Sequence, residues 1–266
     1  MDLATIIGLF GAWAALLGAA VIEGTNLASL LNTSAFILVV GGTFGATVIS
    51  YSLEDVTALP KILGLAFKKQ ATDPLNFIEL LVGYAEKARR EGLLILQEFI
   101  KDTDDKFLVR GMNLVIDGAD PELVRNILET EIVFLEKRHS VGASMLETAG
   151  GFAPTMGIIG TVVGLIKVLS NLDNASELGP AISVAFLATF YGISTANLLW
   201  LPLANKLKHK SKAELLIKEM ILEGILSIQA GENPRIVREK LEVFLPPRLQ
   251  AVVKEQETGK GGGPSD

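Results

Sequence analysis

The stretch from Thr148 to Leu169, TAGGFAPTMGIIGTVVGLIKVL, decides the fold class of this chain. The 19 residues between Glu147 and Lys167 carry no charge. An α-helix rises about 1.5 Å per residue, so about 20 apolar residues cross the roughly 30 Å hydrocarbon core of a bilayer. The stretch therefore predicts a membrane-spanning helix, with Lys167 near enough to its end for the long side chain to reach the interface.

Three further stretches reach the same length: Leu3–Ile22, Ser34–Ser52 and Ala181–Ala204. The 266-residue chain is 49% hydrophobic and only 20% charged, with a mean hydropathy of +0.42. Soluble domains carry about 25% charged residues, so this composition excludes intrinsic disorder and a single soluble domain. We predict an all-α integral membrane protein with four transmembrane helices, a helical cytoplasmic domain between spans two and three, and a C-terminal cytoplasmic helix.

Lysine and arginine positions predict the orientation of the spans. Twelve lie between residues 53 and 140 and eleven follow Asn205, whereas the linkers 23–33 and 170–180 contain none. Because positively charged loops stay in the cytoplasm, we expect both linkers outside and both termini inside. No basic residue precedes Leu3–Ile22, so we interpret this stretch as a retained span rather than a secretory signal.

Prolines mark where the helices outside the membrane begin. Asp73-Pro74 and Asp120-Pro121 each place an N-cap before a proline at the first helical position. The second of these helices has no strong breaker before Gly142, so we expect it to continue into span three. We divide the chain into a transmembrane hairpin (1–52), a cytoplasmic helical domain (53–144), a second hairpin (145–204), cytoplasmic C-terminal helices (205–250) and a disordered tail (251–266).

The sequence contains no pattern of an enzyme or a metal site. It has no cysteine, and His139 and His209 have no ligand partner at metal-binding spacing. It also lacks a phosphate-binding loop and a nucleophile elbow. The net charge of −6 and the pI near 5.1 argue against a nucleic-acid partner. We therefore expect no catalysis, no cofactor and no bound nucleic acid.

The spans carry hydroxyl groups but no interior aspartate or glutamate, which a proton or sodium pathway normally needs. Thr155, Thr161 and Thr189 lie in the second hairpin and are our candidates for an ion pathway. They could equally bond only to carbonyls of their own helices. Glycines 157, 160 and 164 have a spacing that lets helices approach closely, and we favour this packing role for them.

Pro154 and Pro202 lie near the cytoplasmic ends of spans three and four. Each removes a backbone hydrogen bond and bends its helix. Facing each other, they would form a hinge that couples the spans to the cytoplasmic helices. Prolines are also ordinary in membrane helices, so a purely structural role stays open.

Several motifs resemble the MotA/PomA family, whose members are the larger subunit of the bacterial flagellar stator. The motifs are FAPTMGIIGTVVGLI (152–166), LGPAISVAFLATFYG (178–192), ARREGLL (88–94), TAN (195–197), PLANK (202–206) and GENP (231–234). The resemblance extends over roughly residues 1–250 and implies a location in the bacterial inner membrane.

The resemblance also implies partners. Five copies of such a chain surround two single-span MotB/PomB-type subunits, whose helix supplies the ion-binding aspartate that this chain lacks. Ion flow rotates the pentamer, and its cytoplasmic helices push the rotor protein FliG. Pro154 and Pro202 match the two functional prolines of the family.

The residues that would contact the rotor follow the family pattern only in part. Arg89 matches the arginine that meets the rotor, and we add its neighbour Arg90. The acidic contact of the family falls on Gln97 here, and the nearest carboxylate is Glu98. The resemblance thus predicts a contact through Arg89, Arg90 and Glu98, with the acidic position displaced by one residue.

Two alternative functions compete with a stator subunit. An ExbB/TolQ-type proton-driven energiser has three spans, whereas this chain has an additional hairpin before its cytoplasmic domain. A free-standing channel or transporter needs coordinating groups in its own spans and often inverted repeats, and the chain shows no clear internal repeat.

The coupling ion is either sodium or a proton. Sodium must shed water and find several oxygen ligands, whereas a proton needs only one carboxylate. Thr161 and Thr189 resemble the threonines of sodium-type family members, and proton-type members commonly have alanine at the first position. We therefore favour sodium, with Thr161 as a mere packing residue in a proton-driven unit as the alternative.

Overall fold

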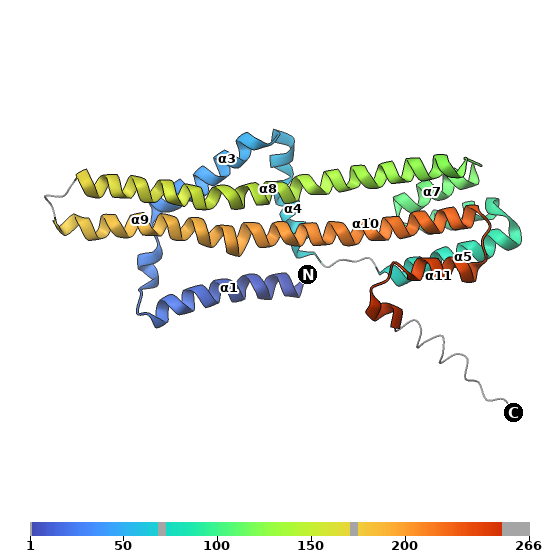
Figure 1. The fold of residues 1–266 in the computed structure, drawn as a ribbon, viewed down its shortest axis with the longest axis horizontal. Coiled ribbons are helices and arrows are strands. Elements are labelled where there is room, and N and C mark those ends of the chain that lie inside the picture. Colours follow the sequence, from blue (N-terminus) through green and yellow to red (C-terminus); the bar gives the residue numbers. More distant parts are fainter. Residues whose placement is uncertain (1, 69–72, 171–174, 252–266) are drawn as a thin grey trace, which may run out of the picture. The chain divides into compact units, whose positions relative to one another are not determined.

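The computed structural model describes residues 2–68, 73–170 and 175–251, and within these ranges every regular element is helical. The residues form two compact units (Figure 1). Residues 1–70 and 138–210 make up the first, which we call the membrane unit. Residues 71–137 and 211–266 make up the second, the extramembrane unit. Helices α8 (Pro121–Ser170) and α10 (Leu201–Gln229) contribute residues to both units.

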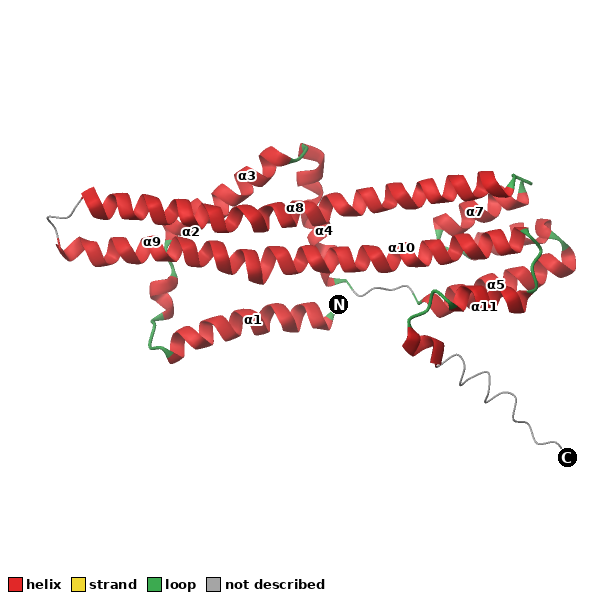
Figure 2. Cartoon of the chain, in the orientation of Figure 1, coloured by secondary structure: helices red, strands yellow, loops and turns green. Residues whose placement is uncertain are grey.

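Four helical stretches are long and apolar enough to cross a membrane, which confirms the predicted all-α fold with four spans. The membrane unit contains α1 (Leu3–Ile22), α2 (Thr33–Phe36), a π-helical turn (Ile37–Gly41), α3 (Gly42–Ser50), α4 (Leu53–Phe67) and α9 (Ala175–Thr195), besides its parts of α8 and α10. Helices α2 and α3 together form the second span (Figure 2). Within the predicted outer linker 170–180, residues 171–174 lie outside the described ranges, and residues 175–180 belong to α9 rather than to a loop.

Capping residues explain where these helices begin. The Asp2 carboxylate accepts the Thr5 N–H at 3.3 Å at the start of α1. Asp120 accepts the Glu122 N–H at 2.9 Å at the start of α8. Helix α8 then runs for 50 residues without a break, as the absence of a breaker before Gly142 predicts.

Helix α4 packs against the spans, although the sequence assigns it to the segment 53–144. Its Ala66 forms a buried cluster with Leu146 of α8 and with Leu203 and Ala204 of α10, and Leu59, Leu63 and Phe67 pack against this cluster. Gly142 of α8 leaves room for this contact, since a Cβ there would lie 2.8 Å from an Ile62 methyl group. Apolar side chains on one face therefore hold α4 to the membrane unit.

The extramembrane unit is a small helical domain with its own core. It contains α5 (Pro74–Glu91), α6 (Leu96–Phe99), α7 (Lys106–Ile116) and α11 (Pro234–Glu242), which pack with parts of α8 and α10. Asp73 caps α5 as predicted, accepting the Leu75 N–H at 3.0 Å. The largest fully buried side chains of this core are Ile78, Leu81, Leu96, Leu108, Met112, Leu128, Met220, Ile221, Ile225 and Ile228.

Ion pairs join the last helices of this unit. Lys240 of α11 donates to the Glu232 carboxylate at 2.7 Å, and its Nζ lies 3.6 Å from Glu223 of α10. The hydrogen bond between Lys240 and Glu232 raises the pKa of the lysine and lowers the pKa of the carboxyl group. The predicted disordered tail falls on residues outside the described ranges, apart from Ala251.

Candidate functional site

Small residues bring α8 and α9 into close contact inside the membrane unit. A Cβ on Gly157 would lie 2.8 Å from the Ala188 carbonyl oxygen, and one on Gly164 would lie 2.6 Å from the Ala185 Cβ. Real side chains do not approach so closely, so only glycine fits at these positions. The packing role predicted for these glycines is therefore confirmed.

The same contact brings two predicted pathway residues together. The Thr161 and Thr189 hydroxyl groups are hydrogen-bonded to each other, and both side chains are half-buried. Thr161 Oγ1 lies 3.0 Å from the Ala185 carbonyl oxygen and 3.2 Å from that of Gly157. Thr189 Oγ1 lies 3.4 Å from the Gly157 oxygen. We call these two hydroxyl groups and two carbonyl groups the oxygen cluster.

The oxygen cluster has the chemistry of a hard-cation site without a charge of its own. Two hydroxyl groups can donate only two hydrogen bonds at once, so the oxygens around them keep unused lone pairs. Hydroxyl and carbonyl oxygens are the ligands that hard cations accept in exchange for water. The hydrogen bond from Thr161 to the Gly157 carbonyl, four residues earlier, is also the bond expected if Thr161 only packs within its helix. The geometry is therefore compatible with an ion-pathway role and with a packing role.

Thr155 does not belong to this cluster. Its side chain is exposed and donates a hydrogen bond to the Phe152 carbonyl oxygen at 2.7 Å. Thr161 follows Thr155 by six positions, which at about 100° per residue turns the two side chains to different faces of α8. The helix geometry therefore separates Thr155 from the other two candidates.

Pro154 and Pro202 do not face each other, so that part of the hinge prediction is wrong. Pro154 lies beside Gly192 of α9, where an added Cβ would be 3.1 Å from the Pro154 Cα. Gly192 is ten residues, or about 15 Å of helix, from Pro202. Pro202 instead lines a cleft next to Thr5 of α1. The close contacts of the α8 glycines with α9 fix how far the two helices are shifted along each other, and this shift separates the two prolines.

A π-helical turn, η5 (Ala196–Trp200), precedes Pro202 and was not foreseen from the sequence. The Leu201 N–H bonds to the Ala196 carbonyl, five residues back. Proline lacks an N–H and its ring clashes with the carbonyl four residues earlier, and a wider turn relieves this clash. In the sequence, only Pro202 indicates a distortion of this helix, and a proline does not specify where a π-helical turn forms.

Tyr191 is another feature of the site that the sequence analysis did not single out. Its hydroxyl group accepts the Asn32 N–H at 2.9 Å and donates to the Leu30 carbonyl oxygen. Its ring meets Phe36 edge-on, with 6.5 Å between ring centres. Tyr191 therefore holds the start of the second span to α9, close along the chain to Thr189.

The three predicted rotor-contact residues are all exposed on the extramembrane unit. Arg89 and Arg90 occupy the last turn of α5, Glu98 lies in α6, and none of them forms an ion pair with another described residue. Lys87 Nζ lies 3.0 Å from the centre of the Phe99 ring, a cation–π contact that holds α6 to the end of α5. The contact thus joins the helix that carries Glu98 to the helix that carries the two arginines.

Comparisons with known proteins agree with this architecture. The sequence model of the MotA/TolQ/ExbB proton channel family matches residues 100–220, and that of the Motility protein A N-terminal region matches residues 6–92. Motility protein A of Bacillus subtilis is 40% identical over 264 residues, which cover 98% of this chain and 97% of that protein. Chemotaxis protein PomA of Vibrio alginolyticus is 36% identical over 245 residues, covering 92% and 96%.

Solved structures show the same relationship. The flagellar MotAB stator complex from Bacillus subtilis contains a chain with a TM-score of 0.88 and 39% identity, covering 93% of this chain and 98% of that one. A chain of C. jejuni MotAB has a TM-score of 0.89 and 32% identity, covering 93% and 97%. The match over residues 6–92 includes the additional hairpin that separates stator subunits from three-span energisers. This multi-pass membrane protein therefore belongs to the MotA/PomA family, the ion-conducting stator subunits of the bacterial flagellar motor.

Proposed function

We propose that five copies of this chain surround two copies of a single-span MotB/PomB-type subunit in the bacterial inner membrane, and that sodium flow between them drives rotation against the rotor protein FliG. Both termini lie in the cytoplasm in this arrangement, as the distribution of lysine and arginine predicts. The solved relatives are MotAB complexes, which supports a MotB-type partner for this chain.

The oxygen cluster is the observation that favours sodium over a proton as the coupling ion. It places two hydroxyl and two carbonyl oxygens between α8 and α9, in spans that contain no carboxylate. A carboxylate from the partner helix would supply the missing charge, and the cluster would replace part of the hydration shell of sodium. A proton would need the partner carboxylate alone, and the proton channel family model keeps that alternative open.

Swimming speed at fixed pH tests the choice of ion. We expect the speed to rise with external sodium, and Thr161→Ala to raise the sodium concentration for half-maximal speed by roughly tenfold or more, because a contact to a charged group contributes about 1.5–3 kcal/mol. Thr161→Ser, which keeps the hydroxyl group, should stay near wild type. Ser183→Ala removes an exposed hydroxyl group of α9 and is the matched control.

The contrary result is equally clear. Speed that is independent of sodium in both the wild type and Thr161→Ala would show that protons drive the motor. In that case the Thr161 hydroxyl group only packs against α9.

We expect the partner helix to pack against the exposed face of α8. Ile158, Val162 and Ile166 recur at intervals of four residues, and each is more than half exposed. Single cysteines at positions 158–165 should therefore form disulfide cross-links to the partner helix more efficiently than cysteines at Leu16 or Ile37. Stronger cross-linking from the latter two positions would place the first hairpin, and not the second, around the partner.

Charge reversal tests the rotor contact. Arg89 and Arg90 are solvated, and exposed ion pairs contribute only about 0–1 kcal/mol each. We expect Arg89→Ala to reduce torque modestly, and Arg89→Glu to reduce it more, because reversal adds repulsion. Torque is measured from beads attached to flagellar stubs. Full torque after reversal of both arginines would exclude this surface as the contact.

A further inference from the structure

Asp2 joins three helices at one end of the membrane unit. Its carboxylate caps α1 and lies 2.6 Å from Lys206 Nζ of α10. Its backbone N–H donates to the carbonyl oxygen of Phe67, the last residue of α4, at 2.8 Å. The hydrogen bond from Lys206 lowers the pKa of Asp2, so this carboxylate is ionised at neutral pH.

Lys210 makes a second connection one helical turn further along α10. Its Nζ donates to the carbonyl oxygens of Leu65 at 2.8 Å and Ala66 at 3.0 Å, and it also contacts the carbonyl of Lys68. The last carbonyl groups of a helix have no partner within the helix, and a cation there satisfies them and interacts favourably with the helix dipole. Lys210 therefore caps the C-terminus of α4 from a different helix.

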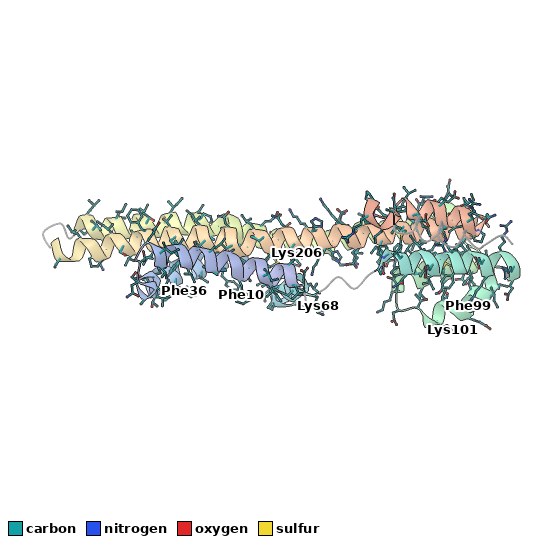
Figure 3. The ribbon with its side chains drawn as sticks, turned by 90° about the horizontal axis from the view of Figure 1, so that it is seen from below. Phe10, Phe36, Lys68, Phe99, Lys101 and Lys206 are labelled. Carbon is teal, nitrogen blue, oxygen red and sulfur yellow. The ribbon has the colours of Figure 1, made fainter. Side chains whose placement is uncertain are left out.

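These contacts lie directly after Pro202 along α10. Lys206 and Lys210 follow the proline by four and eight residues, so both lie on nearly the same side of the helix. Figure 3 shows Lys206 and Lys68 at the same end of the membrane unit. We call Asp2, Lys206 and Lys210 the α1–α4–α10 clamp.

An open cleft lies next to Pro202, beside the α1–α4–α10 clamp. A cleft of about 260 Å³ lies between α1 and α10 and is lined by Thr5, Gly8, Asn197, Pro202 and Lys206, among others. The Thr5 hydroxyl oxygen is buried and has no hydrogen-bond partner among the described residues. Proline also leaves a carbonyl in the preceding turn without its usual donor. The cleft is lined mostly by apolar groups, and bending at Pro202 would thus change this open space rather than a packed core.

We propose that Asp2, Lys206 and Lys210 are positioning residues of the Pro202 hinge, which hold α10 beyond the proline to the start of α1 and the end of α4. Because these contacts fix α10 just after Pro202, a bend at the proline would move the rest of α10 as a rigid helix. Without them, α10 would slide over α1 and α4 instead. The inference rests on the coupling role that the sequence predicts for Pro202, which we keep as a proposal for this proline alone, and it adds the residues that fix one side of that hinge.

The test compares ion conductance with torque in the complex of the full chain and its MotB/PomB-type partner. Asp2→Ser keeps an N-cap for α1 but removes the ion pair, and Lys206→Gln removes the same pair from the other side. We expect each to lower stall torque at least threefold while conductance stays within twofold of wild type. The double variant should be no worse than either single variant, because both remove one interaction.

Three further variants complete the test. Lys206→Arg keeps the charge and should restore most of the torque, and Lys210→Met should resemble Lys206→Gln. Lys208→Gln is the matched control, because Lys208 pairs with Glu147 of α8 at 2.5 Å and lies outside the clamp. It should leave torque and conductance near wild type.

The outcomes separate the clamp from the hinge. If torque, conductance and the melting temperature of the complex fall together in the clamp variants, the residues only stabilise the fold and the proposal is overturned. If Pro202→Ala lowers torque but the clamp variants do not, the hinge stands and the clamp is rejected. If Pro202→Ala leaves torque unchanged, the proposed hinge itself fails, and the clamp proposal fails with it.

Discussion

Replacing Gly192 with alanine is expected to reduce swimming to near zero, because the added methyl group meets the backbone of α8. A Cβ at this position would lie 3.1 Å from the Pro154 Cα and 3.2 Å from the Ala153 carbonyl carbon, and it would also clash with the Ala153 oxygen. Backbone atoms cannot swing aside as a side chain can, so α8 and α9 must separate. Overpacking of this kind costs about 1–3 kcal/mol.

The separation would also pull apart the oxygen cluster three residues away along α9. Swimming speed and the melting temperature of the detergent-purified complex measure the two effects. Gly11→Ala is the control, because Gly11 of α1 has no atom within 4 Å of an added Cβ. The close-contact interpretation would be wrong if the two alanine variants had equal melting temperatures and speeds.

Replacing Leu81 with alanine is expected to destabilise the extramembrane unit by about 2–5 kcal/mol, the usual cost of such a truncation in a core. Leu81 is fully buried, and its methyl groups fill the space that Gly224 of α10 leaves open. Leu94→Ala makes the same chemical change at a side chain that is 73% exposed, where little contact is lost.

Amide hydrogen exchange of the full chain in detergent measures this difference. We expect faster exchange in α5 and α7 of the Leu81 variant, with the membrane unit and the Leu94 variant unchanged. Equal protection in the two variants would contradict the core assignment. The comparison is independent of motility, so a role of Leu94 near the rotor contact does not disturb it.

Local interactions are what the sequence by itself determined about this protein. The four spans follow from long uncharged stretches, because each helix must be apolar over about 20 residues whatever it packs against. Asp73 and Asp120 could be assigned as caps because the donor lies two residues further along the same chain.

Tertiary structure alone decided how these helices meet. Thr161 and Thr189 share hydrogen bonds because Gly157 and Gly164 set the register of α8 on α9, and such a register depends on residues far apart in the chain. The same register separates Pro154 from Pro202. The contacts of Asp2 with Phe67 and Lys206 likewise connect positions that no sequence spacing relates. Helix periodicity specifies which face of a helix is apolar, but the close approach of small residues decides which neighbour that face meets and at what height.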